Sequence, residues 1–233
     1  MNKESISSHL LELRTRLIRI LICLGILSVA GIPFASEIYA FIASPLLDIL
    51  PAGSSMIATQ VTSPFMAPLK LVLFSALLLT MPYLFYELWM FISPGLYKNE
   101  KSFVAPLMIS TIFLFSAGVA FAYLVVLPII FTFFIGVAPE SIQVMTDINQ
   151  YLSFVIKLIF AFGIAFEIPV ATFLLIRTGI VIKDSLIKAR PYLIILFFVI
   201  GMLLTPPDIF SQLFLAIPMW LLFEVGLVVS KKN

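Results

Sequence analysis

One carboxylate stands inside a basic and otherwise apolar segment near the start of the chain. Residues 9–17 read His-Leu-Leu-Glu-Leu-Arg-Thr-Arg-Leu and lead directly into a long apolar run. A helix would place Ile6, Leu10, Leu13 and Leu17 on one side, opposite the polar residues Ser5, Ser8, His9, Glu12, Arg16 and Arg19. A segment that only held an anionic membrane surface would gain from Lys or Arg at position 12. Glu12 therefore indicates another role.

Two roles fit a carboxylate at position 12. The first is an ion pair with Arg16 at i+4, which contributes only about 0.3–0.5 kcal/mol on an exposed helix. The second is a binding site for a cation that belongs to another molecule. Residue types and spacing leave both roles open.

Composition identifies the class of protein that must position this carboxylate. Hydrophobic residues make up 62% of the chain and charged residues 11%, and the mean hydropathy is +1.17. The apolar runs are continuous over about 20 residues, which is typical of spanning helices. We expect an all-α, polytopic helical membrane protein with a single integral membrane domain over residues 1–233. The net charge of +2 gives no support to nucleic-acid binding.

The apolar runs predict six spans, of which the last two are short. They cover residues of about 17–36, 69–92, 104–127, 152–176, 191–205 and 211–229. The fifth, from Pro191 to Thr205, gives only about 22 Å of helix against a hydrocarbon core of about 30 Å. The first long connection predicts a short helix at about residues 38–50 and then an extended segment. Pro128 predicts a bend, or a new short helix, at the end of the third span.

The distribution of basic residues predicts the orientation of these spans. Twelve of the fourteen lie in the terminal segments and in alternate loops, and all twelve share one side if there are six spans: Lys3, Arg14, Arg16, Arg19, Lys98, Lys101, Arg177, Lys183, Lys188, Arg190, Lys231 and Lys232. Lys70 and Lys157 stand at span edges on the other side, where long side chains can reach the interface. The positive-inside rule therefore predicts that both termini are cytoplasmic.

Glu167 is the acidic residue expected deepest in the membrane. It precedes Arg177, at the cytoplasmic end of the same span, by about ten residues or roughly 15 Å. Pro169 lacks an N–H and leaves the carbonyl of Ala165 without its helical partner, so a kink with a polar notch is expected. Glu167 is then either a protonated residue bonded to a neighbouring helix or a polar site for a partner or substrate.

Other polar residues give weaker signals. Glu87 and Glu224 lie about a turn inside the cytoplasmic ends of their spans, where pairing with Arg or Lys is the expected role. His9 has no second ligand nearby, so no metal is expected, and Cys23 is the single cysteine. No nucleophile–base arrangement or phosphate-binding loop appears. We expect neither an enzyme nor a cofactor.

Several segments in order along the chain resemble one family. They are residues 9–14, residues 91–100 (Phe-Ile-Ser-Pro-Gly-Leu-Tyr-Lys-Asn-Glu), residues 153–169, residues 201–208 (Gly-Met-Leu-Leu-Thr-Pro-Pro-Asp) and residues 216–218. Together they resemble the TatC family, the multispanning receptors of the twin-arginine protein translocase. The resemblance implies six helices in the bacterial cytoplasmic (inner) membrane. It also implies binding of twin-arginine signal peptides of folded cargo proteins. The implied partners are TatB and TatA, membrane lipid and further copies of the chain. The resemblance further implies that translocation is driven by the proton-motive force.

The resemblance also implies roles for particular residues. Glu12 and Glu100 would receive the arginine pair, and Phe91 would shape the site beside them. Glu167 and Pro169 would form the intramembrane polar or partner site, and Pro45 and Asp208 would belong to the outer loops. The run Lys98-Asn99-Glu100-Lys101 departs mildly from relatives that carry His or Arg nearby. A proton-coupled or solute transporter using Glu167 is the competing class, although no inverted repeat is visible, and a structural scaffold is a third.

Overall fold

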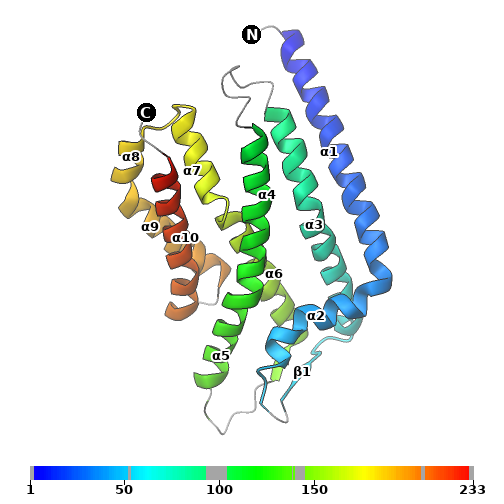
Figure 1. Ribbon diagram of the computed structural model, residues 1–233. Helices are drawn as coiled ribbons and strands as arrows, with labels where there is room; N and C mark the ends of the chain where they lie inside the picture. Colours follow the sequence, from blue (N-terminus) through cyan, green and yellow to red (C-terminus); the bar gives the residue numbers. More distant parts are fainter. Residues whose placement is uncertain are drawn as a thin grey trace. The chain divides into compact units, whose positions relative to one another are not determined.

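The structure is a computed structural model that describes residues 3–51, 54–92, 104–137, 139, 145–205 and 208–230, with side chains from residue 9 onward (Figure 1). Its contacts divide the chain into two compact units. Unit 1 contains residues 1–43 and 60–112, and unit 2 contains residues 44–59 and 113–233. The expectation of a single domain over residues 1–233 stays a prediction.

Unit 1 is built on two long helices, α1 (Lys3–Gly31) and α3 (Ser63–Ile92), which pack side by side (Figure 1). The leucine stripe of α1 faces outward, and Leu10 and Leu17 are exposed. The opposite, polar side of α1 supplies Arg16, which bonds to α3. The amphipathic pattern is therefore the reverse of that of a helix in a soluble protein, because the apolar stripe is exposed and ionic contacts join α1 to α3.

The end of α1 is set by a short helical turn. The 3₁₀ helix η1 (Ile32–Phe34) carries Pro33 in its first turn and leads into α2 (Ala35–Leu47). The predicted short helix at about residues 38–50 is thus confirmed as α2, three residues earlier at each end. The last residues of α2, from Ser44, belong to unit 2.

Unit 2 contains most of the remaining helices. In chain order its elements are β1 (Ser55–Ile57), α4 (Val104–Phe121, whose first turns belong to unit 1), the π-helical turn η4 (Ala122–Val126), α5 (Leu127–Val137), β2 (Met145–Asp147), α6 (Ile148–Ala165), α7 (Ile168–Arg177), α8 (Lys183–Lys188), α9 (Arg190–Leu204) and α10 (Ile209–Val229). The helix α10 packs against α7 and α9. The core of unit 2 includes the fully buried side chains of Leu127, Leu158 and Phe162.

Helices cover the six predicted spans, but a membrane crossed six times stays a prediction. Among the described residues, five helical stretches are long and apolar enough to cross a membrane: residues 9–47, 63–92, 104–137, 148–177 and 209–229. The fifth predicted span is the 15-residue α9, which confirms that it is short. The last span, also expected to be short, is the 21-residue α10, long enough to cross. The chain is therefore a helical, multi-pass membrane protein.

The two proline effects are confirmed. Before Pro128 the helix widens into η4, where the N–H of Leu127 donates to the carbonyl of Ala122, five residues back. Proline at the next position cannot donate, so a local change of hydrogen-bond pattern is the expected response. Before Pro169 the helix breaks outright, and α6 ends at Ala165 while α7 begins at Ile168.

A two-stranded parallel sheet was not predicted. Ser55, Met56 and Ile57 of β1 align with Met145, Thr146 and Asp147 of β2. Asp147 fastens this sheet to α6. One carboxylate oxygen, Oδ1, accepts from the N–H of Asn149 at 2.9 Å and of Gln150 at 3.1 Å, and Oδ2 accepts from the Thr59 hydroxyl at 2.6 Å and the Thr59 N–H at 3.1 Å. The hydrogen bond from the Thr59 hydroxyl is the largest cause that lowers the pKa of Asp147.

Acidification is expected to weaken the hydrogen bonds that Asp147 accepts from Thr59, Asn149 and Gln150. Because the pKa of Asp147 is lower when folded, its contribution is complete above the unfolded pKa of about 3.9 and is lost as the pH falls through the folded value. Hydrogen exchange of residues 55–59 and 145–150 should therefore rise, relative to the intrinsic rate, between about pH 5 and about pH 2. Asp147→Asn should exchange faster already at the higher pH and show little further change. An equal acid response in both proteins would contradict this assignment.

Candidate functional site

The guanidinium group of Arg16 lies between two carboxylates in unit 1. Its Nε and Nη2 donate to Oε1 of Glu12 at 3.0 and 2.7 Å, and its Nη1 donates to Oε2 of Glu87 at 2.6 Å. Glu12 precedes Arg16 by one turn of α1, and Glu87 comes from α3. Arg16 therefore joins the two helices through charge-assisted hydrogen bonds, which are shorter and stronger than neutral ones.

Glu87 is the buried member of this network, with a side chain only 3% exposed. Besides Arg16, it accepts from the Tyr83 hydroxyl at 2.8 Å, and Nη1 of Arg19 lies 3.7 Å from its Oε1. The expected pairing of Glu87 with a basic residue is confirmed. So is that of Glu224, whose Oε2 accepts from Nη2 of Arg190 at 2.6 Å in unit 2.

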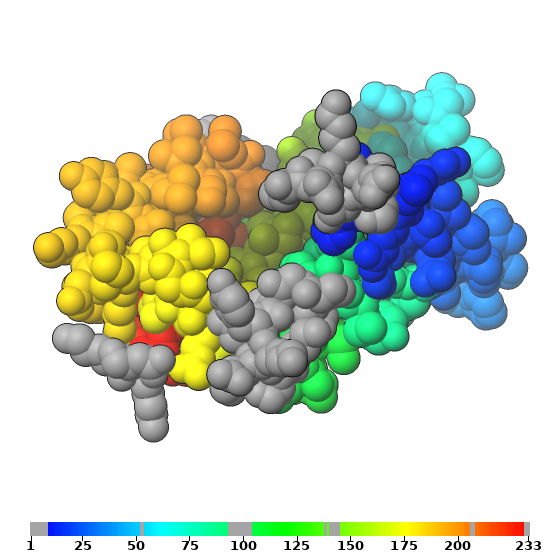
Figure 2. Space-filling model, turned by 90° about the horizontal axis from the view of Figure 1, so that it is seen from above, coloured from blue at the N-terminus to red at the C-terminus, as the bar shows by residue number. Residues whose placement is uncertain are grey.

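Glu12 is the accessible member of the network. Its side chain is 37% exposed, and its second oxygen, Oε2, lies 3.7 Å from Nδ1 of His9. The His9 ring stacks on Phe91 of α3, with ring centroids 4.2 Å apart and planes 15° from parallel. The structure thus brings Glu12 and Phe91 to the same place, on either side of His9. The exposed blue residues of α1 are visible in Figure 2.

These residues suit recognition of a planar cation. An exposed carboxylate supplies an acceptor, and the neighbouring aromatic pair supplies a flat face on which a guanidinium group can stack. Glu100, the second predicted carboxylate, lies outside the described residues, and its role stays a prediction. The Arg16 pairing predicted as the alternative role of Glu12 is present, but Arg16 is also held by Glu87, so pairing and cation binding are compatible.

The second predicted site, at Glu167 and Pro169, lies in unit 2. Glu167 is half-buried at the break between α6 and α7, and Pro169 is buried. The N–H of Glu167 donates to the carbonyl of Ile164 at 3.0 Å, and its own carbonyl accepts from the N–H of Ala171 at 2.9 Å. α10 comes close here, since a Cβ on Gly226 would lie 3.0 Å from Cα of Pro169. The predicted kink is present as an interruption between α6 and α7, and it places an acidic side chain partway along a stretch long enough to span a membrane.

The two residues predicted to belong to outer loops, Pro45 and Asp208, have structural positions in unit 2. Pro45 is buried inside α2, next to Ser44, whose hydroxyl lies 3.1 Å from that of Tyr123. Asp208 caps α10 by accepting from the N–H of Ser211 at 2.7 Å. Asp followed by an apolar run is an ordinary start signal of a helix, so this role was readable from the sequence.

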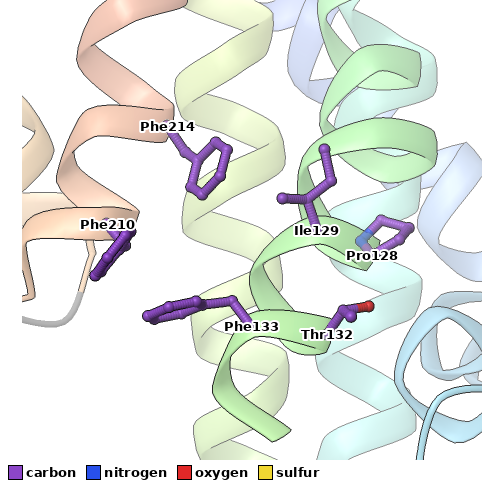
Figure 3. A pocket seen from close by; sticks show the side chains of 6 residues that line it. All are labelled: Pro128, Ile129, Thr132, Phe133, Phe210 and Phe214. Carbon is purple, nitrogen blue, oxygen red and sulfur yellow. The ribbon is translucent and has the colours of Figure 1, made fainter. Parts of the chain in front are cut away.

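Sequence reasoning missed an apolar pocket between α5 and α10. It has a volume of about 480 Å³ and is lined by Pro128, Ile129, Thr132, Phe133, Phe210 and Phe214 (Figure 3). Phe133 of α5 and Phe210 of α10 meet at the pocket, with ring centroids 4.3 Å apart. No residue pattern announced this pocket, because its two walls are more than seventy residues apart in the chain.

Comparisons with known proteins give one family. The sequence profile described as "Sec-independent protein translocase protein (TatC)" matches residues 8–218. The "Sec-independent protein translocase protein TatC" of Azotobacter chroococcum is 56% identical over 94% of this chain and 86% of its own length. That of Haemophilus influenzae is 49% identical over 98% and 89%. A crystal structure titled "Twin Arginine Translocase Receptor- TatC" superposes with a TM-score of 0.85 at 35% identity, over 95% of this chain and 97% of the other.

The profile includes Glu12, Phe91, Glu167 and Asp208 within its matched range. The related sequences and the related fold agree with each other over nearly the whole chain. On these grounds the chain belongs to the TatC family of Sec-independent protein translocase proteins.

Proposed function

We propose that this chain is the receptor subunit of a twin-arginine translocase and binds the signal peptides of folded cargo proteins at the cytoplasmic face. Glu12 and Glu100 receive the two arginines, and Phe91 lines the site. The observation that carries the proposal is the exposed Glu12 carboxylate beside the His9–Phe91 stack.

The different chemistry of arginine and lysine explains why the proposed site prefers arginine in the signal peptide. Guanidinium is planar, always charged and presents a fork of donors to a carboxylate, whereas the ammonium group of lysine acts as a point charge. Each charge-assisted hydrogen bond contributes about 1.5–3 kcal/mol. Loss of one such bond on changing Arg to Lys corresponds to about tenfold or more in affinity.

We further propose the orientation and the partners. Both termini lie in the cytoplasm, in accordance with the positive-inside distribution, and the membrane is the bacterial inner membrane. TatB and TatA join the chain in a translocation site driven by the proton-motive force, and copies of the chain itself and membrane lipid complete the assembly. Membership of a family of translocase proteins supports a role together with other subunits.

Crosslinking tests the proposed site and its side of the membrane together. A photoreactive residue at position 92, next to Phe91 and exposed at the end of α3, should crosslink a precursor that carries a twin-arginine signal. The same residue at position 61, where the native Val is fully exposed in the connection between α2 and α3, should not. A precursor with two lysines in place of the arginines serves as the second control. Equal products at both positions, or from both precursors, would count against the proposal.

Glu167 is proposed to act after binding, in docking of a partner or insertion of the cargo. Glu167→Leu should therefore leave crosslinking from position 92 intact and reduce export of a twin-arginine reporter by about tenfold or more, as expected for loss of an intramembrane polar contact. Glu167→Gln, which keeps the hydrogen-bonding groups, should retain more export. If Glu167→Leu exports normally, the residue is structural only.

A further inference from the structure

The network around Arg16 contains two carboxylates where one would be enough to hold a single guanidinium group. The buried Glu87 already neutralises Arg16, through a 2.6 Å hydrogen bond from Nη1. Glu12 is bonded through different nitrogen atoms, Nε and Nη2. Arg16 can therefore release Glu12 without losing Glu87. The main-chain carbonyl of Met90, 3.4 Å from Nη2, provides an acceptor on α3 for the released nitrogen.

The two carboxylates differ in ways that make this release one-sided. Glu87 is 3% exposed and is oriented by the Tyr83 hydroxyl, whereas Glu12 is 37% exposed. A buried carboxylate cannot lose its cation without a large desolvation cost, but an exposed one can exchange partners at little cost. An incoming cation is thus expected to take Glu12 and leave Arg16 on Glu87.

We propose that Arg16 occupies the Glu12 carboxylate until an arginine of the signal peptide binds there. Glu87 is then a positioning residue that holds Arg16 once the peptide is bound to Glu12. The inference rests on the proposed function, because it concerns the same site. Without Glu87, the full charge of Arg16 would fall on Glu12, and the incoming arginine would have to compete with it. Arg16 and Glu87 together thereby set the affinity of the site without touching the peptide.

The net charge around Glu12 predicts that a single variant binds the peptide more weakly than a double variant does. Glu12, Arg16, Arg19 and Glu87 carry no net charge, and Glu87→Gln leaves them with +1. The double variant Arg16→Gln/Glu87→Gln returns the net charge to zero and also removes the competitor of the peptide. The single change should therefore weaken binding, and adding a second change should restore it. A merely structural role would predict the opposite, since two changes in one network disturb packing more than one.

The experiment measures the affinity of a fluorescent twin-arginine signal peptide for the purified full chain in detergent. Glu87→Gln should bind about tenfold more weakly, as expected for a stronger internal competitor. Arg16→Gln/Glu87→Gln should bind as well as the unchanged protein or better. Glu224→Gln, which breaks the comparable pair with Arg190 in unit 2, is the matched control and should bind normally. Melting temperatures are recorded for every variant.

Two results would overturn the inference: normal binding by Glu87→Gln, or a double variant about tenfold weaker than the unchanged protein. If Glu87→Gln does not fold, the comparison of the double variant with the unchanged protein decides alone. Glu12→Gln separates this inference from the proposed function. If Glu12→Gln loses binding while Glu87→Gln keeps it, only the inference fails, and if Glu12→Gln binds normally, the proposed function fails.

Discussion

Replacing Glu12 with Gln is expected to abolish crosslinking of a twin-arginine precursor while the protein still accumulates in the membrane. The change removes the exposed negative charge and leaves the shape of the side chain almost unaltered. It weakens the acceptor of a charge-assisted bond that contributes about 1.5–3 kcal/mol, so binding should fall by about tenfold to a hundredfold. Arg16 keeps its bond to Glu87, so the packing of α1 on α3 should survive. Crosslinking in membranes, with the amount of protein measured in parallel, checks both halves of this expectation.

Glu37→Gln is the matched control for this experiment. Glu37 is an exposed acidic residue in the first turn of α2, in the same unit as Glu12 but beyond the other end of α1. Its neutralisation should leave crosslinking unchanged. Glu100→Gln is expected to behave as Glu12→Gln does, because the proposal gives the two carboxylates one ligand. Unchanged crosslinking in both the Glu12 and Glu100 variants would remove the receptor site from the account.

Replacing Gly118 with Leu is expected to prevent folding of unit 2. A Cβ at this position of α4 would lie 2.5 Å from the main-chain oxygen of Phe162 and 2.9 Å from the Phe166 ring. The first of these atoms is backbone and cannot move aside without displacing α6. Overpacking of this kind costs about 1–3 kcal/mol and more where the backbone must shift, so even Gly118→Ala should lower stability clearly. Small residues are the usual means by which membrane helices approach so closely.

Gly136→Ala provides the control for Gly118→Ala. Gly136 lies in α5, and a Cβ there meets nothing within 4 Å. Alanine is a better helix former than glycine, by about 1 kcal/mol in a helix interior, so a loss of stability in Gly118→Ala must come from the lack of space. Melting temperature in detergent and accumulation in the membrane should fall for Gly118→Ala and stay level or rise for Gly136→Ala. Equal stability of the two variants would contradict the close packing of α4 on α6.

Features that depend on a single residue's chemistry could be predicted from the sequence. Pro128 and Pro169 lack an N–H, so the altered helix at each follows wherever the neighbouring elements lie. The spans follow from hydrophobic length, apart from the underestimated length of α10. The need of Glu87 for a cation follows from the cost of an unpaired charge in an apolar setting.

Features that depend on which segments meet could not be predicted. Several basic residues were candidates for Glu87, and only the packing of α1 on α3 selects Arg16, 71 residues away along the chain. The sheet of β1 and β2 joins two three-residue strands that are too short for a periodic signal. The stack of His9 on Phe91 arises in the same way, because the two rings belong to different helices and meet only where α1 packs on α3.

The central claim is that Glu12 recognises arginine in a signal peptide, and a two-by-two affinity measurement tests it most directly. Purified protein, unchanged or carrying Glu12→Gln, is titrated with a twin-arginine peptide and with its twin-lysine counterpart. The unchanged protein should prefer arginine by about tenfold or more, and Glu12→Gln should lose most of that preference, because the fork of guanidinium then has no carboxylate to meet. A preference for arginine that is the same in both proteins would contradict the account.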